Sequence, residues 1–96
     1  MFINGHPVCD DHWGQADADV VCRMLGYVTG EPTTHSTFGT VTSTFIMDDV
    51  NCDGSERDIL DCPHEPQHNC GATEAAGVMC SQGKKQQSTF IIQSAT

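Results

Sequence analysis

Six cysteines impose the strongest constraint on what this 96-residue chain can fold into. An even count without a C-x-x-C pair favours a disulfide framework over zinc ligation or thioredoxin-type redox chemistry. Spacing alone leaves several connectivities open, so the partners must be identified from other observations. The cysteines are Cys9, Cys22, Cys52, Cys62, Cys70 and Cys80.

The length predicts one domain that depends on its cross-links. A chain of this size buries about 60 to 65% of its unfolded surface. Each bridge would contribute roughly 3 to 4 kcal/mol, which for three bridges approaches the whole stability of a typical domain. Because disulfides persist only in oxidising compartments, we expect an extracellular protein whose export signal was removed or lies upstream in a longer parent.

The charge is concentrated in one part of the chain. All thirteen acidic residues lie between Asp10 and Glu74, where Arg23 and Arg57 are the only basic residues, and the net charge is −9. Such a field repels nucleic acid and anionic membrane surfaces and attracts cations and basic protein segments. The sequence has no transmembrane run or secretory signal, and neither nucleic-acid binding nor direct membrane insertion is expected.

Two helices are predicted. Apolar residues recur at helical spacing from Ala16 to Leu25, and Gly26 is a natural C-cap. A second, short helix is expected before Pro63, with Ser55 and Asp58 as a capping box and with Ile59 and Leu60 on the buried side.

The strand signals are shorter. Residues 44–47 and 77–80 are β-prone, a short strand near Phe38 is expected within the long connection 28–44, and the first seven residues read as a strand end. Residues 82–96 read as a polar linker with a β-prone tail at 88–92. For that tail a frayed end is favoured over an extra strand that covers a sheet edge.

Four segments together resemble the signature blocks of the scavenger receptor cysteine-rich (SRCR) domain, in order and at similar spacing. The resemblance places an SRCR-like domain at residues 1–81, and the tyrosine after Leu25-Gly26 makes it similar to the six-cysteine group A. The segments are VCDDHW (8–13), ADVVCRMLGY (18–27), DDVNCDGSE (48–56) and EAAGVMC (74–80).

The resemblance implies a small disulfide-rich α+β fold, in which a curved antiparallel sheet cradles one main helix and a short second helix is added. It also implies the pairs Cys9 with Cys70, Cys22 with Cys80 and Cys52 with Cys62. The family's usual first strands are missing or replaced here, which exposes a sheet edge. The tail or a second chain could fill that edge, so a dimer or domain swap is expected.

The family is a ligand-binding one, so the resemblance implies a scavenger or pattern-recognition module and not an enzyme. No catalytic nucleophile motif is present, and every cysteine is assigned to a bridge. The alternative is an accessory domain that positions its neighbours in a larger secreted protein, with no metal-dependent binding of its own.

The resemblance also implies two cation sites. The first would use Asp10, Asp11 and Glu74, and the second Asp48 and Asn69. Carboxylate and amide oxygens suit Ca²⁺ or Mg²⁺, and such a cation could bridge to an anionic macromolecule or a protein carboxylate, while basic protein segments could meet the acids directly. The alternative is that these acids, with Asp49, are solvated loop residues that begin turns.

Overall fold

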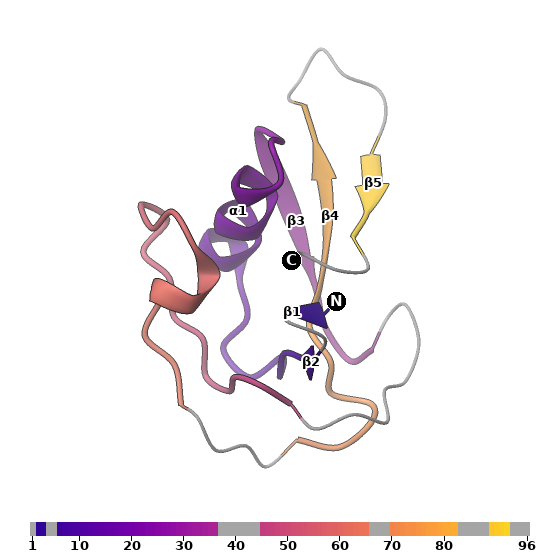
Figure 1. The fold of residues 1–96 in the computed structure, drawn as a ribbon. Coiled ribbons are helices and arrows are strands. Elements are labelled where there is room, and N and C mark those ends of the chain that lie inside the picture. The colour runs from indigo at the N-terminus through magenta and orange to yellow at the C-terminus, as the bar shows by residue number, and fades with distance from the viewer. Residues whose placement is uncertain (1, 4–5, 37–44, 66–69, 83–88, 93–96) are drawn as a thin grey trace.

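A computed structural model describes residues 2–3, 6–36, 45–65, 70–82 and 89–92 (Figure 1). The α+β class with one main helix and antiparallel sheets is confirmed. Figure 1 shows the helix packed beside two neighbouring strands, with a third, shorter strand on their far side and loops in the lower part of the molecule. In chain order the elements are β1 (Phe2–Ile3), β2 (His6–Pro7), α1 (Gln15–Met24), β3 (Thr29–Thr33), η1 (Ile59–Asp61), β4 (Gly77–Ser81) and β5 (Thr89–Ile91).

The described strands form two antiparallel sheets. β1 pairs with β2, and the larger sheet has the order β3-β4-β5. β4 is the central strand of this order, and its alternate residues Val78 and Cys80 are fully buried. β3 carries a glycine, a glutamate and a proline, so strand propensity did not reveal it, whereas the expected strand near Phe38 lies outside the described residues.

Helix α1 confirms the predicted helix within one residue at each end. Its N-terminus is closed by the Asp17 carboxylate, which accepts the backbone N–H of Gly14 at 2.8 Å. Gly26 follows the helix at φ +89°, a left-handed conformation that glycine adopts without a steric penalty. Residues 18 and 20–22 are buried against the sheet.

The second helix is shorter than expected and is capped differently. It is the 3₁₀ turn η1, and Asp58 is its N-cap, accepting the N–H of Leu60 at 2.9 Å. Ser55 instead donates its hydroxyl to Asp53 at 2.6 Å. Ile59 is fully buried, but Leu60 is 38% exposed, which corrects the prediction that both residues face the core.

Three disulfides staple the elements together with the pairing that the resemblance implies. Cys22–Cys80 joins α1 to β4 inside the core, with both residues fully buried. Cys52–Cys62 closes the loop that ends in η1. The fully buried side chains around them are Ile3, Val8, Val20, Val21, Val50, Ile59 and Val78.

Two sequence predictions about strands need correction. The tail is not a frayed end, because Thr89–Ile91 pairs antiparallel with β4. Residues 44–47 do not form a strand over their described part, where Met47 makes only an isolated bridge to Val8. That bridge nevertheless holds the 45–49 segment beside the loop after β2.

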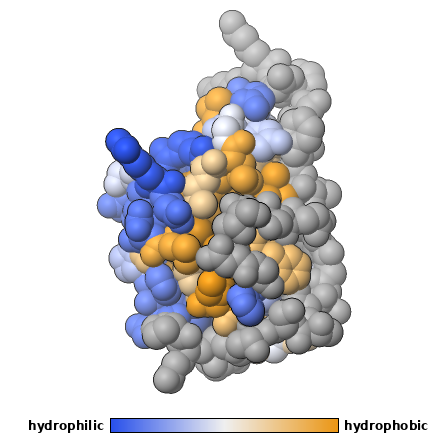
Figure 2. Space-filling model, viewed as in Figure 1, coloured by the Kyte–Doolittle hydropathy of each residue, from blue (hydrophilic) through white to orange (hydrophobic). Residues whose placement is uncertain are grey.

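Polar and apolar side chains separate over the visible surface. In Figure 2 hydrophilic residues cover the side where α1 and the η1 loop lie in Figure 1, and apolar residues gather toward the middle of the face. Val28 is the most exposed large apolar residue described, at 58%. Among the described residues, no helix has both the length and the apolar character needed to cross a bilayer.

Candidate metal centre

Three loops distant in sequence are held together at the lower end of the molecule by backbone contacts and a disulfide. Cys9 donates its N–H to the carbonyl of Met47 at 3.0 Å, and Asp10 donates to the carbonyl of Glu74 at 2.9 Å. The Cys9–Cys70 bridge adds a covalent link between the first and third loops. These contacts fix the backbone that carries the acidic side chains.

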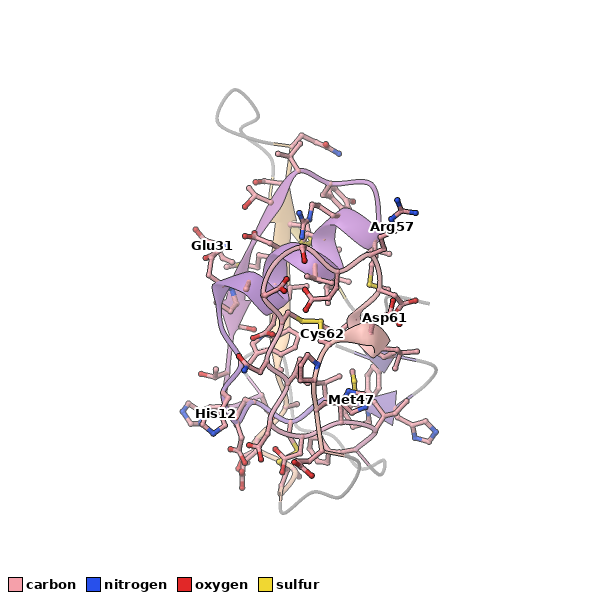
Figure 3. All side chains as sticks on the ribbon, turned by 90° about the vertical axis from the view of Figure 1, so that its left-hand side faces the viewer. His12, Glu31, Met47, Arg57, Asp61 and Cys62 are labelled. Carbon is pink, nitrogen blue, oxygen red and sulfur yellow. A yellow bond between two sulfur atoms is a disulfide. The ribbon has the colours of Figure 1, made fainter. Side chains whose placement is uncertain are left out.

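The first loop is anchored from both of its ends. Val8 and Cys9 are fully buried, and Trp13 is 7% exposed with its indole N–H donating to the Gly77 carbonyl at 3.0 Å. His12, between them, has φ +63° and projects outward at the edge of the molecule (Figure 3). The buried ends leave the middle of the loop, including Asp11, at the surface.

Asp11 lies at the centre of an acidic cluster. Carboxylate oxygens of Asp11, Asp48 and Asp49 lie within 4.8 Å of one another. Oxygens of Asp11 and Glu74 are equally close, together with the Cys70 sulfur, which is bridged and so is not a ligand here. We call Asp11, Asp48, Asp49 and Glu74 the acidic cluster.

The acidic cluster changes the ionisation of Asp11. Partial desolvation raises the pKa of the Asp11 carboxyl, and the negative charge of Asp48 raises it further, as do a hydrogen bond with Asp48 and the charges of Asp10 and Glu74. This repulsion arises because several carboxylates share a small volume. A bound divalent cation would offset it, because the cation favours the ionised carboxylates.

Asp10 does not join the acidic cluster in this structure. Its Oδ2 accepts the backbone N–H of His35 at 2.7 Å and lies 3.4 Å from the His35 ring nitrogen. The Asp10 side chain is buried, whereas the His35 ring is exposed. The sequence grouped Asp10 with Asp11 and Glu74, but neighbouring residues in a loop can point in different directions, and here they do.

Residues that the sequence assigned to two separate sites lie close together where the structure describes them. Asp48 is 5% exposed and lies beside Asp11, not in a separate place. Asn69 lies outside the described residues. Asp49 belongs to the acidic cluster although it was not among the predicted ligands. Its position next to Asp48 and its φ of +51°, which Asp tolerates better than most residues, turn it toward Asp11.

The donor set fits a hard cation. Within the acidic cluster, the carboxylates of Asp11, Asp48 and Asp49 form one group, and Asp11 is separately close to Glu74; oxygen ligands of this kind suit Ca²⁺ or Mg²⁺. Asp48 also accepts the N–H of Asp49 at 2.8 Å, which holds one of its oxygens in place. His12 lies 3.6 Å from Asp49, so an imidazole lies at the rim of the acidic cluster.

Comparison with known proteins places this chain in a family. The family model of the scavenger receptor cysteine-rich domain matches residues 3–81. The chain belongs to the SRCR family. With six cysteines in three disulfides, this SRCR domain is consistent with group A.

The curated relatives are much longer than this SRCR domain. A scavenger receptor cysteine-rich domain superfamily protein of Patiria pectinifera is 45% identical over 84% of this chain, which spans 8% of that protein. The macrophage receptor MARCO of Mesocricetus auratus is 44% identical over 76% of the chain, which spans 15% of the receptor. MARCO of Mus musculus is 43% identical over 77% of the chain.

Solved SRCR structures share the fold. The dimeric form of the mouse MARCO SRCR domain has a TM-score of 0.75 at 39% identity, covering 84% of this chain and 81% of that one. The third SRCR domain of murine neurotrypsin has a TM-score of 0.75 at 38% identity, covering 86% and 82%. Both comparisons support one antiparallel framework around a single main helix.

Proposed function

We propose that this SRCR domain is an extracellular, non-catalytic ligand-binding module whose acidic cluster holds a divalent cation, and that the cation meets the ligand. The observation that carries the proposal is the convergence of Asp11, Asp48 and Asp49 within 4.8 Å. These oxygens come from loops 37 residues apart, taking Asp48 minus Asp11, so only the folded, disulfide-bonded chain assembles them. Similarity to macrophage receptor MARCO supports a receptor role.

The chemistry of the acidic cluster defines two ligand classes. With Ca²⁺ or Mg²⁺ bound, carboxylates leave coordination positions that a sulfate, phosphate or carboxylate of an anionic macromolecule can fill. Without the cation, the same carboxylates attract lysine and arginine side chains of a basic protein segment. The two modes compete for the same oxygens, so chelation should affect them in opposite directions.

Calorimetric titration with Ca²⁺ tests the metal site directly. Extracellular modules bind Ca²⁺ with Kd values of roughly 10⁻⁴ to 10⁻³ M, and we expect the oxidised domain to lie in that range. Asp11→Asn should weaken binding by about tenfold or more, because ligand charge sets affinity. Glu31→Gln is the matched control, because it removes the same charge from an exposed residue of β3 that is not part of the acidic cluster.

Two probe ligands then separate the binding modes. Binding of dextran sulfate should require Ca²⁺ and should be lost in EDTA, whereas binding of an oligolysine peptide should strengthen in EDTA. Equal loss in Asp11→Asn and Glu31→Gln would show that overall charge, and not the acidic cluster, controls binding. Absence of Ca²⁺ binding in the millimolar range would reject the metal-dependent proposal.

The second candidate is a positioning domain of a larger secreted protein. This candidate is favoured because the chain spans only 8 to 15% of the length of two curated relatives. In that case the acids provide solubility. Any binding of Ca²⁺, dextran sulfate or oligolysine should then be the same in Asp11→Asn as in the control. The oxidising compartment that three disulfides need is common to both candidates.

A further inference from the structure

The six cysteines, all of which lie within the described residues, differ in their access to solvent. Five of them are buried, and Cys70 is the exception, because part of this residue reaches the surface. A dissolved thiol opens a disulfide only through a sulfur that it can reach. Within the three bridges, the accessible target is therefore the Cys70 end of Cys9–Cys70. The buried cysteines are Cys9, Cys22, Cys52, Cys62 and Cys80.

Carboxylates surround this end of the bridge. Cys70 Sγ lies 3.9 Å from Asp48 Oδ1, and it lies within 4.8 Å of carboxylate oxygens of Asp11 and Glu74. A thiol attacks as its thiolate, so these negative charges slow the approach of every thiol. A thiol that also carries a positive group is attracted by the same carboxylates. At about 4 Å in water, one unit charge changes the energy of another enough to alter a rate roughly fivefold.

The loops that the bridge joins are also held together by backbone contacts. Asp10 donates its N–H to the Glu74 carbonyl at 2.9 Å, and Ala76 donates to the Val8 carbonyl at 2.8 Å. These hydrogen bonds lie on either side of Cys9 and do not involve its sulfur. Opening of the bridge therefore leaves the Cys9 sulfur close to its former partner, where it can attack again and close the bridge.

We propose that the Cys70 end of Cys9–Cys70 is a thiol-exchange site that selects small thiols carrying a positive charge. The thiolate sulfur of the incoming thiol bonds to Cys70 Sγ, the Sγ–Sγ bond breaks, and Cys9 leaves with the electron pair as a thiolate, which takes a proton from water. The incoming sulfur is oxidised and Cys9 is reduced, so no further oxidant takes part. The positive group of the attached thiol pairs with the carboxylates of Asp11 and Glu74. Attack by Cys9 reverses the reaction.

Exchange rates with three small thiols test the charge selectivity. Cysteamine is positive, 2-mercaptoethanol is uncharged, and 2-mercaptoethanesulfonate is negative. The full oxidised chain is treated with each thiol in EDTA, at low salt and about pH 8, so that histidines are neutral. Each rate is expressed per thiolate and divided by the rate of the same thiol with bis(2-hydroxyethyl) disulfide, which corrects for nucleophilicity. The corrected rate should fall about tenfold or more from cysteamine to the sulfonate, and added salt should narrow this range.

Mapping of the first product tests the position of the exchange. After brief treatment with cysteamine and rapid alkylation, peptide mass spectrometry should find cysteamine on Cys70 and the alkyl group on Cys9, with the other two bridges intact. Cysteamine or alkylation found first at one of the other four cysteines would overturn the site. Equal corrected rates for the three thiols would overturn the selectivity.

Two variants separate the local carboxylates from the overall charge of the domain. Asp11→Asn should narrow the range of corrected rates by about fivefold, because one of the charges beside Cys70 is removed. Glu31→Gln removes the same charge outside the acidic cluster and should keep the wild-type range. Equal narrowing in both variants would show that the net charge, and not the carboxylates around the bridge, selects the thiol. All rates are measured in EDTA, so the result does not depend on Ca²⁺ binding.

Discussion

The buried carboxylate of Asp17 accepts the backbone N–H of Cys52 at 2.8 Å, which ties the first turn of α1 to a loop 35 residues further along the chain. The other oxygen of Asp17 accepts from Gly14. One side chain thus caps the helix and positions the Cys52–Cys62 disulfide. Only 3% of Asp17 is exposed, and its hydrogen bond with Cys52 is buried, whereas the one with Gly14 is partly buried.

Replacing Asp17 tests this double role. In Asp17→Asn one of the two backbone donors faces an amide NH₂ group and loses its acceptor, which should cost about 1 to 3 kcal/mol of unfolding free energy. Urea denaturation of the oxidised protein measures this loss. Asp19→Asn, two residues later on the same helix, is a milder comparison, because Asp19 is only partly buried and binds the edge of β3.

The same residue predicts a pH dependence. Burial raises the pKa of Asp17 above 3.8, and this effect exceeds the opposing hydrogen bonds from Cys52 and Gly14. Because the folded state then binds protons more tightly than the unfolded state, this group's contribution to stability is greatest below pH 3.8 and falls as the pH rises through the folded pKa. The stability advantage of wild type over Asp17→Asn should therefore be larger at pH 3 than at pH 7. An advantage that grows with pH would contradict the raised pKa.

Gly30→Ala should destabilise the junction between α1 and the sheet. A Cβ at this position would collide with Cys22 Sγ and lie 3.2 Å from the carbonyl oxygens of Ala18 and Met79. Overpacking of this kind typically costs about 1 to 3 kcal/mol. Gly14→Ala is the matched control, since the nearest atom to its Cβ would be 3.9 Å away. Equal melting temperatures for the two variants would show that the Cys22–Cys80 region is not tightly packed.

The disulfides should differ in their contributions. The chain-entropy estimate gives about 4 kcal/mol for Cys22–Cys80 and about 3 kcal/mol for Cys52–Cys62, because their sequence separations are 58 and 10. Paired alanine substitutions, measured by urea denaturation, should rank in that order. The loss of two fully buried sulfurs adds to the first value. The opposite rank would indicate residual structure in the unfolded state.

If the acidic cluster binds Ca²⁺, the ion should stabilise the fold. At a Ca²⁺ concentration ten times the Kd, linkage predicts about 1.4 kcal/mol, or a rise in Tm of roughly 5 to 10 °C for a domain of this size. EDTA should reverse the rise. The shift should be absent in Asp11→Asn and retained in Glu31→Gln. The same shift in both variants would place the cation elsewhere.

Local patterns predicted α1 and β4 well, because their information lies within a few residues: apolar side chains at helical spacing and a glycine after the last turn in α1, and a short apolar run in β4. The capping of η1 was predicted wrongly, since Ser55 and Asp58 are both suitable caps and the sequence does not rank them. β3 was missed because a Thr-Gly-Glu-Pro-Thr segment becomes a strand only through pairing with β4 and the side chains of α1.

The sequence by itself determined the family, the three-disulfide framework through that family, and an anionic domain with acidic loops. Only the tertiary structure decided that Asp11, Asp48 and Asp49 converge while Asp10 turns to His35, and that the tail forms an edge strand. The physical reason is that cysteine pattern and charge are properties of the chain. The direction of a loop carboxylate is instead set by hydrogen bonds to residues that folding brings near.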